Sequence, residues 1–201
     1  MRRGKLGCIV LAAGFSSRMG AEKALLEVEG TTLLSWLVER LSKVQIDPLI
    51  VIRTEIANNV KELFEGYDVV VNPKPENGRT GSIQAGIARL HEKGKGPCRI
   101  LLVPIDRPGF SDSTLEKLIL SEETTCPEMN GKGGHPILIS AEDSQKILLA
   151  QPGVPLRELV SPKKFEVDDK FLHLNVDTQE EMVKFGEIIR GRNIGNDRFD
   201  Q

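Results

Sequence analysis

The sequence predicts an α/β fold with a mostly parallel central sheet that is covered by helices on both faces. Short apolar runs alternate with longer segments of helical spacing through the first half of the chain. The short runs are almost continuously apolar, which is typical of strands that are buried on both faces. Strands that alternate with helices in this way form parallel sheets with right-handed crossovers.

Each element is placed by its own local pattern. In the segment 31–44, leucine and valine recur at i, i+3 and i+4, and Thr31 or Thr32 is a candidate helix cap. The predicted strands are residues 6–13, 49–53, 68–71, 100–103, 136–140, 164–167 and 171–176. The predicted helices are residues 31–44, 55–64, 82–92, 113–120, 141–150 and 178–190.

Length and composition limit the classes of protein that fit. A chain of 201 residues predicts one domain, which we place at residues 1–190, followed by a polar tail at 191–201. The net charge of −2 disfavours nucleic acid as a partner, because no overall positive field would attract phosphate backbones. Three dispersed cysteines argue against a disulfide framework. The first apolar run is too short to span a membrane, so we expect a cytoplasmic protein without a membrane partner.

The strongest signal is a loop that directly follows the first predicted strand. It reads Leu-Ala-Ala-Gly-Phe-Ser-Ser-Arg-Met-Gly-Ala-Glu-Lys, from Leu11 to Lys23. Small residues let a ligand approach the backbone, and N–H groups in such a loop can point at an anion. Arg18 and Lys23 add two cations for phosphate. The loop is neither a Walker A motif nor a dinucleotide GxGxxG motif, which disfavours a nicotinamide-dependent dehydrogenase.

Carboxylates follow two later predicted strands. Asp106 comes directly after an apolar run, at the sheet edge where ligands of open α/β folds bind. Mg²⁺ binds proteins through one or two carboxylates together with phosphate oxygens and water. Asp106 is therefore a candidate Mg²⁺ ligand, and Asn175 or Asp177 is a candidate for the second. Asp177 is equally suited to capping the helix that follows, so its role stays open here.

These motifs resemble those of the MobA-like nucleotidyltransferase family. The fixed positions of the family's opening signature, L-A-[AG]-G-x-S-x-R-M-G-x-x-K, are all met. Later segments are similar to the family's substrate loop, its D-x-P motif, the G-H-P motif of its cytidylyltransferase branch and its closing motif. In this chain they are residues 72–86, 104–108, 134–136 and 175–180. Arg107 stands where the D-x-P motif usually has Met, Gly133 where that branch often has Arg, and Gln179 where the closing motif has Pro.

The resemblance implies a three-layer, Rossmann-like sandwich of the nucleotide-diphospho-sugar transferase type. It also implies that Mg²⁺ assists transfer of a nucleoside monophosphate from an NTP to a phosphorylated acceptor, with release of pyrophosphate. Arg18, Lys23 and Asp106 are the catalytic residues that it implies, and His135 is an acceptor contact. The nucleotide-binding residues implied are Leu11, Ala12, Ala13, Gly14, Arg18, Lys23, Asn72, Gly81, Ser82 and Asp106.

The resemblance also bears on the nucleotide. Ala13 and the segment Gly134–Pro136 are similar to the branch that transfers CMP from CTP to the molybdopterin cofactor. Two alternatives stay open, namely GTP-dependent transfer to molybdopterin or another phosphorylated acceptor, and a non-catalytic nucleotide-binding module. A molybdoenzyme is a further candidate partner.

Overall fold

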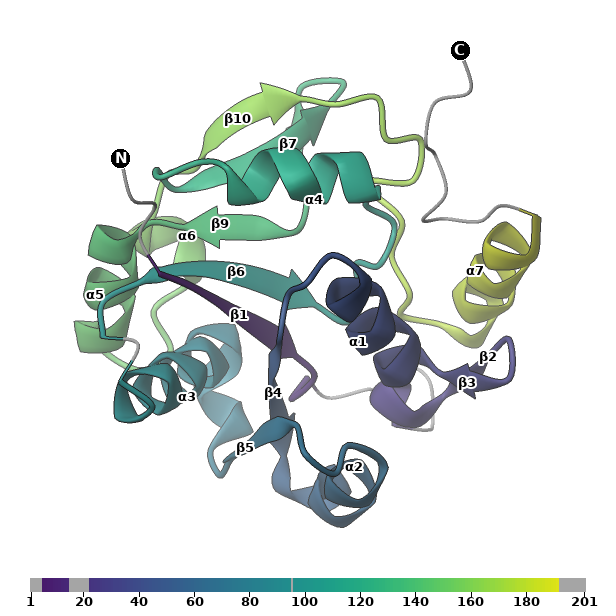
Figure 1. The fold of residues 1–201 in the computed structure, drawn as a ribbon, viewed down its shortest axis with the longest axis horizontal. Helices are drawn as coiled ribbons and strands as arrows, with labels where there is room; N and C mark the ends of the chain where they lie inside the picture. Colours follow the sequence, from purple (N-terminus) through teal and green to yellow (C-terminus); the bar gives the residue numbers. More distant parts are fainter. Residues whose placement is uncertain (1–4, 15–21, 95, 192–201) are drawn as a thin grey trace.

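The computed structural model describes residues 5–14, 22–94 and 96–191. Most of their strands form one sheet in the order β10-β7-β9-β6-β1-β4-β5, with β8 paired to β7. Figure 1 shows this sheet running from β10 at the top to β5 at the bottom. The strands are β1 (Leu6–Leu11), β4 (Leu49–Arg53), β5 (Asp68–Asn72), β6 (Arg99–Pro104), β7 (Thr125–Met129), β8 (Lys132–Gly133), β9 (Ile137–Ile139) and β10 (Lys163–Glu166), with a separate hairpin of β2 (Glu27–Val28) and β3 (Thr31–Thr32).

Helices cover both faces of the sheet, as the sequence predicts. Along β1 the side chains alternate, so that Cys8 and Val10 belong to one buried cluster and Ile9 and Leu11 to the other. The first cluster includes residues of α1 (Leu33–Lys43), α2 (Ala57–Leu63), α4 (Asp112–Ile119) and α7 (Gln179–Gly191). The second includes residues of α3 (Gly78–Glu92) and α5 (Ala141–Leu149), and partly buried residues of α6 (Leu156–Leu159) pack against it. The three-layer α/β architecture is therefore confirmed.

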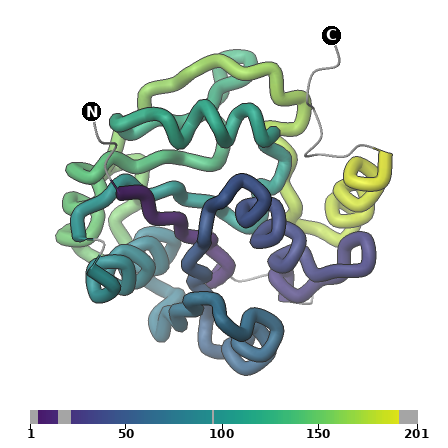
Figure 2. Tube along the Cα trace, in the orientation of Figure 1, coloured from purple at the N-terminus to yellow at the C-terminus, as the bar shows by residue number. Residues whose placement is uncertain are grey.

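The parallel part of the sheet determines where a site can form. β1 pairs in parallel with β4 on one side and with β6 on the other, and β5 extends the parallel run beyond β4. Figure 2 shows β1, in purple, in the middle of this arrangement. The carboxyl ends of these four strands consequently meet at one edge. β9 runs antiparallel to β6 and to β7, which makes the sheet mixed toward β10.

Two of the segments that differ from their predicted structure lie in the second half of the chain. The predicted strand at 171–176 is a turn, in which the Leu172 N–H donates to the Asp169 carbonyl (2.9 Å) and the Leu174 N–H to the Phe171 carbonyl (2.8 Å). Its apolar residues are buried by packing against the core and not by pairing in the sheet, since Leu172 belongs to the first cluster. In contrast, β7 is a strand that was not predicted, because Pro127 and Glu128 interrupt its apolar pattern.

The C-terminal part packs on the same core. The ring of Phe185 on α7 meets Trp36 on α1 edge to face, with centroids 5.0 Å apart. Gly191 ends α7 and is therefore not part of a tail, and residues 192–201 lie outside the described part of the chain.

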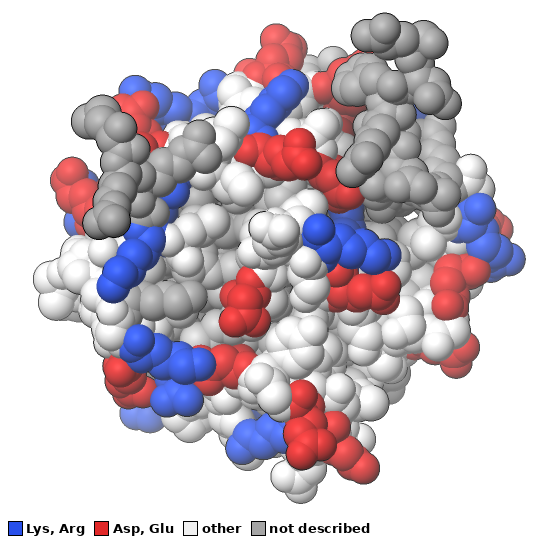
Figure 3. Space-filling view, viewed as in Figure 1, with Lys and Arg blue, Asp and Glu red and all other residues white. Residues whose placement is uncertain are grey.

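Within the described residues no helix has the length and apolar character needed to cross a membrane. On the face drawn in Figure 3, basic and acidic side chains are interspersed.

Candidate functional site

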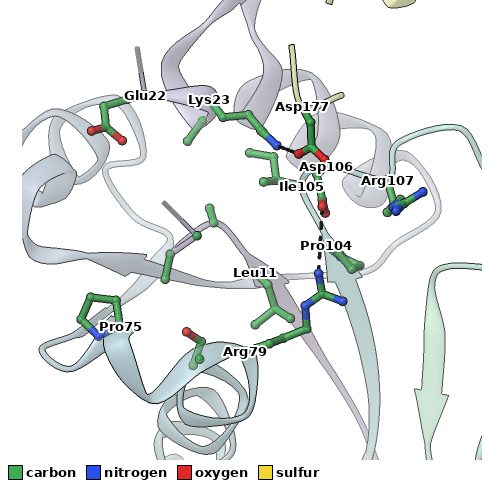
Figure 4. A pocket seen from close by; sticks show the side chains of 16 residues that line it. Leu11, Glu22, Lys23, Pro75, Arg79, Pro104, Ile105, Asp106, Arg107 and Asp177 are labelled. Atoms are coloured by element: carbon green, nitrogen blue, oxygen red, sulfur yellow. Dashed lines mark hydrogen bonds and ion pairs between the residues drawn. The ribbon is translucent and has the colours of Figure 1, made fainter. Parts of the chain in front are cut away.

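A pocket of about 480 Å³ lies at the carboxyl edge of the parallel strands. Figure 4 shows that its side chains come from segments far apart in the sequence, including the ends of β1 and β6, the start of α3 and the turn before α7. The lining residues are Leu11, Ala12, Ala13, Gly14, Glu22, Lys23, Ala24, Pro75, Gly78, Arg79, Ser82, Pro104, Ile105, Asp106, Arg107 and Asp177. Many of the residues singled out from the sequence thus line one cavity.

The segment after β1 forms one wall. Sheet hydrogen bonding continues one residue past the strand, because the Ala12 N–H donates to the Val51 carbonyl (2.8 Å) and the Ile105 N–H to the Leu11 carbonyl (3.2 Å). Ala12 and Ala13 are buried, so their small side chains let the cavity approach the backbone closely. The sequence-predicted phosphate ligand Arg18 lies outside the described residues, which resume at Glu22.

Arg53, at the end of β4, joins the two described flanks of the loop. One Nη atom donates to the Gly14 carbonyl (3.0 Å), and the other forms an ion pair with Glu22. The Nε atom lies 3.3 Å from the Glu55 carboxylate. The side chain is only 8% exposed, and a buried guanidinium needs such partners to offset the loss of its water. Sequence reasoning missed Arg53, although a charged residue closing an apolar strand was the available signal.

Lys23 and Asp177 lie next to one another on one side of the pocket (Figure 4). The Lys23 ammonium forms an ion pair with the Asp177 carboxylate, and the Asn175 amide donates to the second oxygen of that carboxylate. Asp177 does not cap α7. Glu181 accepts the N–H groups of Asp177 (2.8 Å) and Thr178 (2.9 Å), and the Thr178 hydroxyl accepts the Glu181 N–H (3.2 Å). The carboxylate of Asp177 is therefore directed at the pocket, where the sequence had left its role open.

Asp106 is held close to the segment that carries Asp177. The Val176 N–H donates to the Asp106 carbonyl (3.0 Å), which joins the end of β6 to the turn before α7. The same two segments touch at Gly109, where a Cβ atom would lie 2.0 Å from the Phe171 carbonyl oxygen. Only glycine permits that approach, because any side chain would push the two segments apart. On its pocket side, the Asp106 carboxylate lies 4.0 Å from Arg79.

The oxygens of this cluster suit a divalent cation. Asp106 and Asp177 both line the pocket, and Asn175 Oδ1 is buried without a hydrogen-bond partner among the described residues. No group of three His, Cys, Asp or Glu side chains suited to a metal occurs among the described residues. Mg²⁺ commonly binds through one or two carboxylates and completes its shell with phosphate oxygens and water. The donor set therefore fits an ion that arrives with a phosphorylated ligand.

Some predicted site residues do not line the pocket. The Asn72 amide donates to Ser82 Oγ (3.0 Å), and its carbonyl accepts the Lys74 N–H (3.0 Å), so Asn72 orients a lining residue. At Gly81 a Cβ atom would lie 2.8 Å from that of Asn77, which identifies a tight turn of the chain. Asn175 acts through Asp177, because its amide donates to that carboxylate.

Of the residues that the sequence did not single out, Arg79 and Glu22 line the pocket.

His135 also lies outside the pocket lining, and it is neutral at physiological pH. The pKa of its imidazole is lowered from 6.5 to about 4, first by burial and then by the positive charges of Arg79 and Arg107, while Asp106 opposes the shift. Its Nδ1 atom is buried, and no residue in the described part of the chain forms a hydrogen bond with it. The pKa of His135 therefore depends on the charged residues of the pocket, although the imidazole itself is uncharged at physiological pH.

The lowered pKa predicts a pH-dependent loss of stability. Between pH 6.5 and pH 4 the unfolded chain binds a proton at His135 that the folded protein excludes, so stability falls as the pH falls. From pH 7 to pH 5 the wild type should lose about 2 kcal/mol more than His135→Asn. Urea unfolding of both proteins at several pH values measures this difference. Parallel pH dependence of the two proteins would contradict it.

The chain has relatives among known nucleotidyltransferases. It is 24% identical over 189 residues to the molybdenum cofactor cytidylyltransferase of Escherichia coli K12, covering 89% of this chain and 94% of that protein. It is 32% identical over 200 residues to a molybdenum cofactor guanylyltransferase of Vibrio atlanticus, covering 90% and 95%. Each branch of molybdenum cofactor nucleotidyltransferases is thus represented.

Solved structures share the fold. The structure of Rv0371c from Mycobacterium tuberculosis H37Rv superposes with a TM-score of 0.76 at 24% identity, covering 92% of this chain and 98% of that one. A complex of the same mycobacterial protein with manganese matches with a TM-score of 0.72 at 23% identity, covering 90% and 98%. Residues 8–166 match the family model of the MobA-like NTP transferase domain. This chain therefore belongs to the MobA-like NTP transferase family and is a nucleotidyltransferase.

Proposed function

We propose that this protein transfers CMP from CTP to the phosphate of the molybdenum cofactor and releases pyrophosphate. The observation that carries the proposal is the convergence of the β1 loop, Lys23 and Asp106 in one pocket of about 480 Å³. The similarity to the Escherichia coli cytidylyltransferase along most of both chains supports the acceptor and the nucleotide. The molybdoenzyme partner stays a prediction.

The reaction needs no nucleophile from the protein. An oxygen of the acceptor phosphate forms a bond to the α-phosphorus of the NTP, the bond from that phosphorus to the bridging oxygen breaks, and pyrophosphate leaves. The chain's task is to align two anions and to neutralise their charge. Lys23 lines the pocket close to Asp177, and in our proposal it contacts the α-phosphate as charge develops. Arg18 is assigned to the β- and γ-phosphates on the sequence alone.

Mg²⁺ is the proposed cofactor. Asp106 and Asp177 would hold it, and the Asn175 amide, which donates to Asp177, would orient that carboxylate. When bound there it would polarise phosphate oxygens and neutralise part of their charge. The manganese complex of the mycobacterial protein supports a divalent ion in this fold. Because Asp177 pairs with Lys23, occupation of that carboxylate would release the lysine toward the nucleotide.

GTP is the second candidate nucleotide, since the Vibrio atlanticus relative is a guanylyltransferase with higher identity. Ala13 is the residue that favours the smaller base in our proposal. Its side chain is buried and lines the pocket, so it takes space that a purine would need. The third hypothesis, a binding module without catalysis, is disfavoured because Lys23 and Asp106 both face the same cavity.

The nucleotide assignment is tested by competition. With equal CTP and GTP, Mg²⁺ and molybdopterin cofactor, we expect kcat/KM to favour CTP by roughly 10- to 200-fold, the range that pocket size supplies. Ala13→Gly should narrow the ratio without reversing it. Ala88→Gly, at an exposed position of α3, should leave the ratio unchanged. Equal or better use of GTP by the wild type would refute the CTP assignment, and absence of pyrophosphate with every NTP would refute nucleotidyl transfer with this acceptor.

The metal assignment is tested at Asp106. Asp106→Asn keeps the shape of the side chain but removes its charge, so we expect turnover to fall by about 100-fold or more while the thermal midpoint changes little. Asp47→Asn, at an exposed site outside the pocket, is the matched control. Turnover and its Mg²⁺ dependence are measured by pyrophosphate release. Normal Mg²⁺-dependent turnover in Asp106→Asn would place the ion elsewhere.

Because Arg53 contacts both Gly14 and Glu22, we predict that it positions the loop between them for binding the NTP. Arg53→Lys keeps a positive charge beside Glu22 but loses the fork that also reaches the Gly14 carbonyl. We expect the KM for the NTP to rise about 10-fold, since a charge-assisted hydrogen bond is lost, with a smaller change in kcat. Arg89→Lys alters a surface ion pair with Asp68 and serves as the control. An unchanged KM in Arg53→Lys would exclude the positioning role.

A further inference from the structure

We infer that Arg79 and Arg107 form a binding site for the phosphate monoester group of the acceptor, on either side of Asp106. The inference rests on the proposed nucleotidyl transfer and adds the residues that select the second substrate. It concerns the part of the pocket around Asp106.

The two arginines come from different elements and both lie near Asp106 (Figure 4). Arg79 is the second residue of α3, and Arg107 directly follows Asp106 after β6. Both line the pocket. Figure 4 shows Arg79 pointing at Asp106, and Arg107 beside Asp106 on the side away from Glu22 and Pro75. An anion that reaches Asp106 from this side of the pocket therefore meets two guanidinium groups.

Both guanidinium groups have N–H donors that the contacts within the described residues do not use. Arg79 lies 4.0 Å from the Asp106 carboxylate, the longest ion-pair distance among the described residues, and the Arg79 side chain is 52% exposed. Arg107 donates to the His173 carbonyl at 3.4 Å, and no ion pair of Arg107 occurs within the described part of the chain. A guanidinium carries five N–H donors in a planar fork that matches two phosphate oxygens.

The charges around the pocket favour an anion at this end. Glu22 is paired with Arg53, and Lys23 with Asp177. If a divalent ion occupies Asp106 and Asp177, the contact of Arg79 with Asp106 is replaced, and Lys23 becomes available to the nucleotide. Arg79 and Arg107 then remain as two cations beside the metal ligand. The positive charges of both arginines already reach His135, whose pKa they lower.

A phosphate monoester is the acceptor group that fits best. The attacking oxygen must approach the nucleotide next to Asp106, and a dianion at that place needs more than one positive charge to offset the loss of its water. Two forks that approach from different elements can hold two of its oxygens and leave the third free to attack. A carboxylate carries a single charge and only two oxygens, so it would leave one fork unused.

Binding of methyl phosphate tests the inference without turnover. The full chain is saturated with Mg²⁺ and α,β-methylene CTP, and methyl phosphate is titrated by calorimetry. We expect Arg107→Met and Arg79→Met each to weaken methyl phosphate binding about 10-fold or more. The double variant should lose less than the product of the two single losses, since both side chains hold one group. Arg157→Met, on the exposed α6, should bind as the wild type does.

The outcomes separate the two proposals. Failure of the wild type to bind the CTP analogue contradicts the proposed function. Normal analogue binding together with unchanged methyl phosphate binding in both variants overturns the arginine site alone. The arginine site is also overturned if Arg79→Met weakens the analogue and spares methyl phosphate, or if acetate binds the wild type as tightly as methyl phosphate. Circular dichroism of each variant verifies that the fold is retained.

Discussion

The position of β1 between two parallel partners is the constraint on which the site depends. Hydrogen bonds to β4 and β6 fix the end of β1 against the ends of both neighbours. Residues that follow the three strands, such as Ala13 and Asp106, are brought to one sheet edge together with Arg53. A shift of one residue in either register would exchange the two faces of the strand and redirect these side chains. The buried clusters on both faces prevent that shift, because each accepts only its own alternate set of side chains.

Three pairs of opposite charges form at the described part of the pocket before any substrate is present. Asp177 is paired with Lys23, Glu22 with Arg53, and Asp106 lies near Arg79. Charges in a partly enclosed cavity lose much of their water, and a paired arrangement offsets that loss. The pairs also hold segments from distant parts of the sequence in place. A metal–nucleotide complex would exchange partners with these groups, so that each ion keeps a counter-charge throughout binding.

Local patterns predicted the first half of the chain better than the second. The strand at 49–53 was predicted with the observed ends, and Thr32 caps α1 as expected, accepting the Ser35 N–H at 3.0 Å. The errors at 171–176 and 125–129 have one cause. Apolar side chains in a turn can be buried as completely as those of a strand, and a strand toward the sheet margin tolerates proline and charge. A pattern of apolar residues indicates which side chains are buried. It predicts a strand only where the buried segment also pairs in the sheet.

The sequence by itself determined the fold class and the loop from Leu11 to Gly14, and it identified Lys23 and Asp106 as candidate site residues. These predictions depend on residues that are adjacent along the chain. Only the tertiary structure decided the partners of those residues. Arg53, Arg79 and Asp177 come from segments separated by many residues, and no local pattern records that β4, α3 and the turn before α7 end at the same place. The carboxylate of Asp177 became a pocket group because Glu181 and Thr178 cap the helix in its stead. Contacts of this kind are properties of the packed chain, since they form only when strand register and helix packing bring distant side chains within hydrogen-bonding distance.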